Sequence, residues 1–180
     1  MENFLNGKFN PNILIDAPED SIQAKIFNSL FLHTRQHIKV NLDSSDLYKQ
    51  MQAQVLKELL AKRVYNPDSP EDWSVFKKIL LKSVQIYFDS DIQQRSFDKN
   101  VIGGIRDSGI ILSGTNKGLS IALDFKQIND YLKHNKNVIL PMLARIDKAR
   151  TIIKSSTNNE YDLLERSQDR GFIQILQSYC

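Results

Sequence analysis

The stretch at residues 109–123 constrains the fold of this 180-residue chain more than any other segment. Gly109 favours a left-handed cap that ends a preceding helix, and residues 110–112 follow as a short apolar strand. Residues 113–118 contain two glycines among polar side chains, which is typical of a turn. Apolar side chains then alternate with other residues over positions 119–123. The sequence therefore predicts a helix that leads directly into a β-hairpin.

Two amphipathic helices are predicted upstream of this unit. The first covers residues 46–63, where apolar side chains recur at helical spacing. The second begins with Ser69 as its N-cap and Pro70 in its first position. Its expected buried stripe consists of Trp73, Phe76, Ile79, Leu80 and Val84. Both helices thus have a face that needs a partner in a core.

The helix that leads into the hairpin is predicted at residues 97–108. Its apolar side chains share one helical face: Phe97, Val101, Ile102 and Ile105. Gly103 and Gly104 lie inside it, and two glycines in a helix interior cost about 2 kcal/mol relative to alanine. That cost predicts that another helix, or the backbone of a ligand, approaches closely at this point.

The N-terminal region, residues 1–45, is predicted as an arm or a small extension that contains strands. The apolar run 12–15 could be a strand or an extended arm. Residues 21–32 have helical spacing with Asp20 or Ser21 as a possible cap. Residues 37–42 alternate between polar and apolar side chains, which predicts a half-buried strand.

The C-terminal region, residues 125–180, is predicted to be helical. Asp124 is expected to cap a short helix that ends near residue 134, and a separate helix is expected over residues 138–154. The apolar side chains of that last helix predict a homodimer or another partner: Leu140, Leu143, Ile146, Ala149 and Ile153. The expected fold class is α+β, mainly α.

Composition narrows the function classes. No run of about 18 apolar residues occurs, so no membrane span is predicted, and the first residues lack the pattern of a secretory signal. Cys180 is the single cysteine, which excludes disulfides and cysteine metal clusters within one chain. A cytoplasmic protein without metal or cofactor is expected. The net charge of +3 does not by itself indicate a nucleic-acid ligand.

Three helices followed by a hairpin resemble the winged helix-turn-helix of bacterial and phage DNA-binding proteins. The similarity covers residues 46–123 in topology and is most specific over residues 105–119, where an aliphatic residue and Arg106 precede Gly109, a strand, a polar turn and Lys117-Gly118. Leu119 stands where that family usually has an aromatic residue. The resemblance implies a winged-helix domain at residues 46–124 that binds double-stranded DNA, in transcription regulation or in a mobile-element or defence system.

Candidate DNA contacts gather at two places. The start of the third helix supplies amide and basic groups that can pair with base edges: Gln93, Gln94, Arg95, Ser96, Lys99 and Asn100. Arg106 follows near the end of that helix. The wing supplies polar groups that can meet phosphate or a minor groove: Ser113, Thr115, Asn116 and Lys117.

Other functions remain open on the sequence. A protein-interaction module would use the same fold without DNA. A small nuclease would need an acidic pair and a lysine, for which Asp16, Glu19 and Lys25 are the candidates. His33 and His37 have i, i+4 spacing, but no third metal ligand is evident. The 113–118 turn lacks the Gly-Lys-Ser/Thr order of a phosphate loop. An enzyme is therefore less expected than a binding protein.

Overall fold

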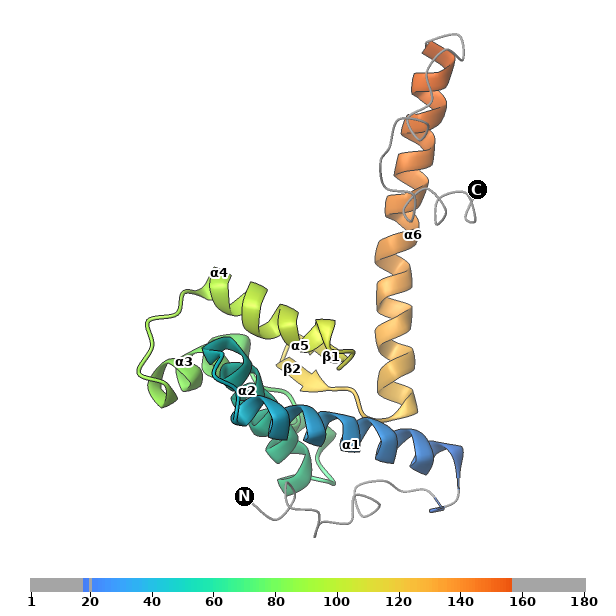
Figure 1. Cartoon of the computed structure of the whole chain (residues 1–180). Helices are drawn as coiled ribbons and strands as arrows, with labels where there is room; N and C mark the ends of the chain where they lie inside the picture. The colour runs from blue at the N-terminus through green and yellow to red at the C-terminus, as the bar shows by residue number, and fades with distance from the viewer. Residues whose placement is uncertain (1–17, 20, 157–180) are drawn as a thin grey trace. The chain divides into compact units, whose positions relative to one another are not determined.

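The computed structural model describes residues 18–19 and 21–156, and this part of the chain is mainly helical with one two-stranded antiparallel sheet (Figure 1). The chain divides into two compact units, Met1–Asn129 and Asp130–Cys180. The predicted strand or arm at residues 12–15 lies outside the described residues. The elements that belong to the first unit are α1 (Ile22–Leu42), α2 (Leu47–Tyr65), η2 (Pro70–Asp72), α3 (Lys77–Tyr87), α4 (Gln94–Ser96), η3 (Phe97–Ile102), α5 (Gly103–Asp107), β1 (Leu112–Thr115) and β2 (Gly118–Ile121).

Helix α1 is longer than predicted and replaces the strand expected at residues 37–42. Ser21 caps it, since its side chain accepts a hydrogen bond from the Ala24 amide at 3.2 Å. The strand prediction was wrong because the alternating pattern also fits a helix. Ile38 and Leu42 are four residues apart and fall on the face that continues from Phe31.

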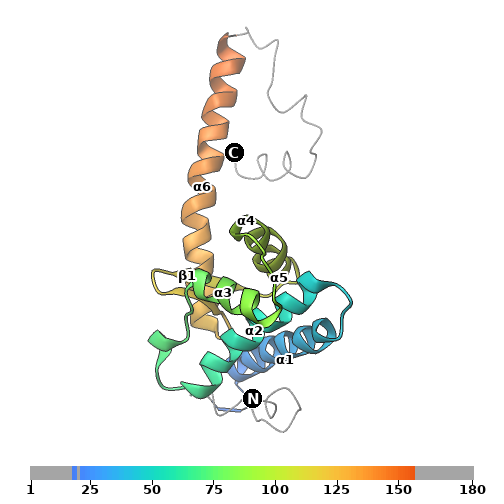
Figure 2. The ribbon, with the colours of Figure 1, turned by 90° about the vertical axis from the view of Figure 1, so that its left-hand side faces the viewer.

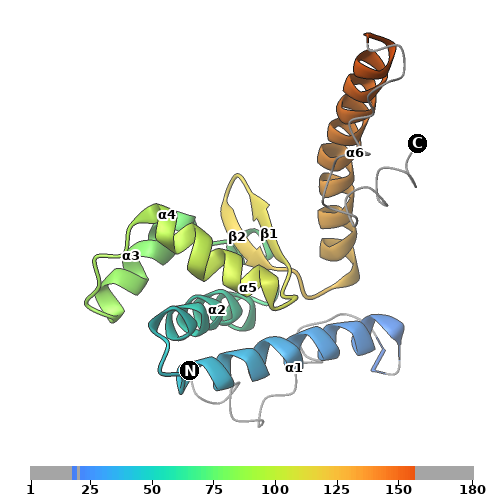
Figure 3. The ribbon, with the colours of Figure 1, turned by 45° about the horizontal axis from the view of Figure 1, so that its top comes forward.

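Helices α1 and α2 lie side by side and contribute a large part of the core (Figures 1 and 3). Phe27 and Phe31 of α1 are fully buried, with ring centroids 6.1 Å apart. Asp46 caps α2 by accepting a hydrogen bond from the Tyr48 backbone amide at 2.8 Å, at the position where the sequence predicts that this helix begins. Residues 22–42 are therefore part of the core and not a peripheral arm.

The second predicted helix is divided in two. Pro70–Asp72 forms the 3-10 turn η2, and Val75 is then extended and pairs with Leu119 through two backbone hydrogen bonds of 2.9 Å. Helix α3 begins only at Lys77. Leu80 and Val84 are buried as predicted, but Phe76 and Ile79 are 48% and 51% exposed. Phe76 precedes α3, and Ile79 falls outside the face that Leu80 and Val84 share, so neither side chain joins the core.

Elements α4, η3 and α5 form one continuous helix, here called the helical segment 94–107, which packs against α2 (Figures 2 and 3). Its central stretch, η3, is π-helical. Gln52 of α2 donates a hydrogen bond to the Asn100 carbonyl at 2.8 Å. A Cβ at Gly104 would overlap the Gln52 side chain, so the close approach predicted from the glycine pair is confirmed.

The hairpin follows Gly109, whose φ of 85° is the left-handed cap that the sequence predicts. In the register, Leu112 faces Ile121 and Thr115 faces Gly118. The turn is thus shorter than the predicted 113–118, because the strands continue into its outer residues. Hairpins prefer such two-residue turns since their twist matches that of the strands.

Helix α6 spans Phe125–Ser156 without interruption, so the predicted break between residues 134 and 138 is wrong. The polar residues 135–137 include no proline or glycine and continue the helix. Pro141 lies inside the helix and not in a first turn. Within α6, Leu143 is the buried residue. None of the described helices combines the length and the apolar character needed to cross a membrane.

Candidate nucleic-acid interface

A groove of about 470 Å³ separates the helical segment 94–107 from the hairpin and the start of α3. Its walls include Lys77, Asp98, Ile102, Arg106, Gly114 and Asn116. Two of the predicted contact residues, Arg106 and Asn116, therefore line one groove although they come from different elements. The fold brings them together because the hairpin turns back after Gly109.

Arg95 and Lys99 lie one turn apart on the helical segment, and both side chains are exposed. Phe97, which lies between Arg95 and Lys99 in the sequence, and Val101, which follows Lys99, are fully buried in the core. The core thus fixes which side of the helix faces solvent, and that side carries positive charge. Lys117 is exposed at the tip of the hairpin.

The other predicted contact residues are less available. Gln93 donates a hydrogen bond to the Asp91 carbonyl at 3.0 Å, and Gln94 donates one to the Asp98 carboxylate at 2.9 Å. Ser96, Asn100 and Ser113 are half-buried. The Thr115 side chain lies outside the described part of the structure. Each glutamine uses one amide N–H in these bonds and keeps its other N–H and its Oε1 for a base edge.

Sequence reasoning missed an ion pair at the groove. Lys77 Nζ lies 3.0 Å from the Asp98 carboxylate, and both side chains are partly exposed. Lys77 thereby offsets a negative charge that would otherwise stand near Arg106 and repel a phosphate. No sequence pattern indicates this pair, because α3 and the helical segment meet only in the folded chain.

Gly118 allows the hairpin to approach the extended segment at Val75, which precedes α3. Its φ is 121°, and a Cβ there would overlap the backbone of Val75. Only glycine allows the two hydrogen bonds between Val75 and Leu119 to form at 2.9 Å. The hairpin is therefore held by the segment between α2 and α3 as well as by the hydrogen bonds between its own two strands.

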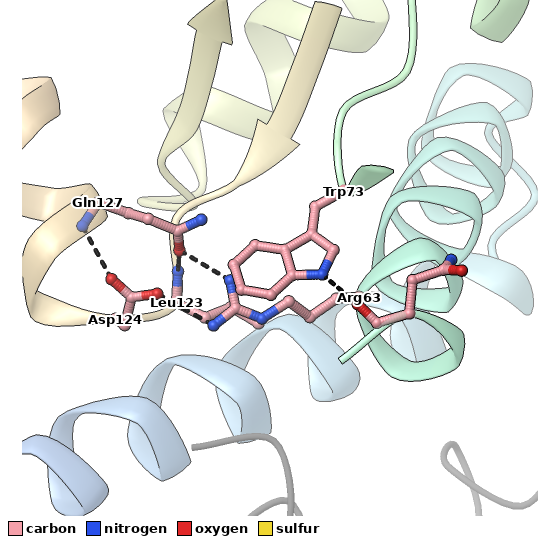
Figure 4. A network of polar contacts seen from close by, with 6 residues as sticks. Arg63, Trp73, Leu123, Asp124 and Gln127 are labelled. Atoms are coloured by element: carbon pink, nitrogen blue, oxygen red, sulfur yellow. Dashed lines mark hydrogen bonds and ion pairs between the residues drawn. The ribbon is translucent and has the colours of Figure 1, made fainter. Parts of the chain in front are cut away.

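A buried arginine secures the other end of the hairpin (Figure 4). Arg63 forms an ion pair with Asp124 at 3.0 Å and donates a hydrogen bond to Gln127 at 3.1 Å. Its guanidinium lies 3.4 Å from the centre of the Trp73 ring. Burial lowers the pKa of Arg63, and the hydrogen bond and charge of Asp124 oppose that shift. A basic residue near the end of a helix is the one sign of this network that sequence reasoning could have used.

Asp124 and Gln127 join the same network to the chain that leaves the hairpin. The Asp124 carboxylate accepts a hydrogen bond from the backbone amide of Gln127 at 2.8 Å, which confirms the predicted cap. The Gln127 side chain accepts one from the Leu123 amide at 3.0 Å. Both anchors of the hairpin are therefore polar and local to the first unit.

The histidines take part in structural contacts. His33 Nε2 donates to the Ser108 carbonyl at 3.0 Å, which ties α1 to the end of α5. His37 Nε2 accepts from the Asn41 amide group at 2.7 Å, and burial lowers the pKa of His37. No group of three possible metal ligands occurs among the described residues. Glu19 and Lys25 are exposed, and Asp16 lies outside the described residues.

No protein-family model, curated protein or solved structure matches this chain. The function of the candidate interface must therefore be inferred from its own residues. The groove, the exposed basic side chains and the two anchors of the hairpin are the observations that bear on it.

Proposed function

We propose that residues 46–124 form a winged-helix domain that binds double-stranded DNA through the helical segment 94–107 and the hairpin. The groove that Arg106 and Asn116 share is the observation that carries this proposal. It makes the helix and the hairpin neighbouring parts of one surface, which a DNA duplex could contact together. Arg95, Lys99 and Lys117 add positive charge on exposed parts of the same two elements.

The arrangement of elements supports the winged-helix interpretation. Helix α2, helix α3, the helical segment 94–107 and the hairpin follow one another in the order that the resemblance implies. The pairing of Val75 with Leu119 fixes the hairpin against the helices, so it can act as a rigid wing. A rigid wing loses little conformational entropy when it binds.

The chemistry of the exposed groups suits a duplex. A helix fits the major groove, which is about 12 Å wide, and arginine or lysine can pair there with guanine. Arg95 and Lys99 are in the best position to meet both base edges and the adjoining phosphates, because core packing directs them outward. Lys117 and Asn116 at the hairpin tip are suited to phosphate oxygens.

The proposal is tested by DNA binding measured over a range of salt concentrations. The double variant Arg95→Ala/Lys99→Ala should bind a mixed-sequence duplex at least about tenfold more weakly. The slope of log K against log salt should fall by about 2, because each lost phosphate contact removes about 0.9. A matched variant, Lys39→Ala/Lys49→Ala, removes two exposed lysines from α1 and α2. If both double variants bind like the parent, the proposed interface is wrong.

A second candidate function, a protein-interaction module, is favoured by the outer face of α3. Ile79, Ile86 and Tyr87 are exposed there and line a hollow of about 570 Å³ together with Lys78 and Lys82. Apolar side chains grouped on a surface commonly mark a protein interface. In this case Ile79→Asp/Ile86→Asp would abolish binding of the partner protein, and Arg95→Ala/Lys99→Ala would leave that binding unchanged. A role in transcription regulation, mobile elements or defence remains a prediction.

A further inference from the structure

Helix α6 carries a heptad repeat along its length. Apolar side chains, with one asparagine among them, recur at alternating spacings of three and four residues: Phe125, Ile128, Leu132, Asn135, Ile139, Met142, Ile146, Ala149 and Ile153. This spacing averages 3.5 residues, which is the period of a coiled coil. The sequence-based division into two helices interrupted the repeat, and the continuous helix restores it.

The seam formed by these residues is largely exposed within the chain. Leu132, Ile139 and Met142 are 56%, 50% and 53% exposed. Residues midway between seam positions on the opposite side, such as Asn137, Ala144 and Thr151, are small or polar and also exposed. The helix thus has one apolar seam, which Val138, Leu143 and Ile152 widen at its flanks, and a strip of small or polar residues opposite it.

We propose that α6 pairs with α6 of a second copy of this chain in a parallel two-stranded coiled coil. A helix that packs on a globular surface has an apolar stripe with a period of 3.6 residues, which drifts by about 20° per heptad from a period of 3.5. The seam of a strict heptad repeat stays in contact along its whole length only with another helix that supercoils around it. An identical helix presents the complementary seam in the same register.

Part of the seam agrees with two strands. Counting from Phe125 as position a, the last three a positions are Ile139, Ile146 and Ile153, and β-branched residues at a belong to the two-stranded parallel pattern. The d positions lack the leucine of that pattern: Ile128, Asn135, Met142 and Ala149. The mass measured in solution therefore decides between two copies and a larger bundle.

Asn135 determines the direction of the partner. In the parallel arrangement it faces Asn135 of the second copy, and the two side-chain amides can pair. Any antiparallel arrangement that keeps a positions against d positions sets Asn135 against an apolar a residue such as Ile146, which leaves two buried amides without partners. The parallel arrangement brings Arg145 near Arg150 of the second copy, but like charges at a solvated edge cost less than buried unpaired amides.

Sedimentation equilibrium of the full chain without DNA tests the pairing. The parent should show the mass of two chains, and Ile139→Glu/Ile146→Glu should show the mass of one. Asn137→Glu/Ala144→Glu adds the same charge on the opposite side of the helix and should stay paired. Trp73, the single tryptophan, lies in the first unit and reports by fluorescence that this unit is folded. A parent with the mass of one chain, or two variants with equal masses, overturns the proposal.

Cross-linking tests the direction. In a Cys180→Ser background that keeps Asn135, Ala149→Cys should give a disulfide-linked pair under mild oxidation, because two d positions face each other in the parallel arrangement. Asn137→Cys, on the opposite side of the helix, should not. Failure of Ala149→Cys to cross-link while the mass remains that of two chains overturns the parallel arrangement. Since these measurements use no DNA, their outcome is independent of whether the proposed DNA binding holds.

Discussion

The first unit and helix α6 have similar patterns of apolar side chains, but these side chains are buried in the first unit and largely exposed in α6. In the first unit, Phe27, Phe31 and Phe97 are fully buried by contacts within the unit. Within α6, Leu143 is the buried residue, and side chains such as Ile139 and Met142 remain about half exposed. An apolar pattern therefore shows which face needs a partner, but it does not show whether the partner belongs to the same chain. The stability of the first unit should be independent of whether α6 pairs with a second copy.

The largest effect is expected from Arg63→Ala, which should lower the free energy of unfolding of the first unit by about 3 kcal/mol. The substitution leaves Asp124 without its ion-pair partner and removes the contact with the Trp73 ring. Denaturant unfolding followed by Trp73 fluorescence measures the change. Lys77→Ala, which breaks an ion pair with exposed members, should cost less than about 1 kcal/mol. Equal losses in the two variants would contradict the special role of the buried network.

Gly118→Ala should lower stability by about 2 kcal/mol, because a side chain there is strained at its positive φ and overlaps the Val75 backbone. The hairpin would separate from the extended segment at Val75, and DNA affinity should fall with it. Gly114→Ala is the matched control for stability, since its nearest neighbour is a Leu119 methyl at 3.9 Å. Thermal unfolding of both variants checks the difference in stability, and a DNA titration of Gly118→Ala measures the loss of affinity. A stable Gly118→Ala protein would show that the hairpin is not held in this way.

The two adjacent glycines of the helical segment should respond differently to alanine. Gly104→Ala should cost about 1 kcal/mol, since the Gln52 side chain must move and its hydrogen bond to Asn100 is lost. Gly103→Ala meets only the Asp98 carbonyl at 3.4 Å and should be neutral or slightly stabilising. Parallel denaturant titrations measure both. The reverse order of stability would mean that α2 does not approach at Gly104.

The smallest effect concerns pH. Burial lowers the pKa of His37 in the folded chain below the ordinary value of 6.5. The unfolded chain therefore binds the proton first, and stability should fall as the pH drops below 6.5. His37→Gln should flatten this part of the stability profile, measured by denaturant unfolding from pH 7.5 to 5. An unchanged profile would assign the pH dependence to other groups.

Local chemistry made part of this structure predictable. The caps at Asp46 and Asp124, the left-handed Gly109 and the helical face of Phe97 and Val101 each depend on residues close in sequence. The same local reasoning failed at residues 37–42, because a short alternating pattern fits a helix that packs on α2 as well as a strand.

Contacts between distant segments could not be predicted. The pairing of Val75 with Leu119, the Arg63 network and the Lys77–Asp98 ion pair each join elements that meet only after folding. The candidate interface is divided in the same way. Its side chains could be named from the sequence, but the groove that unites Arg106 with Asn116 required the fold.

The π-helical stretch η3 allows the helical segment 94–107 to lose one residue without reorienting its ends. A π-helical turn is a helix with one extra residue, absorbed locally while the flanking turns keep their orientation. Gln52 stabilises this stretch by bonding to the Asn100 carbonyl. A deletion of one residue between Phe97 and Ile102 could therefore relax the stretch to a regular α-helix. Arg95 and Arg106 would keep their directions, so a gap at this position in an alignment need not signal a different ligand.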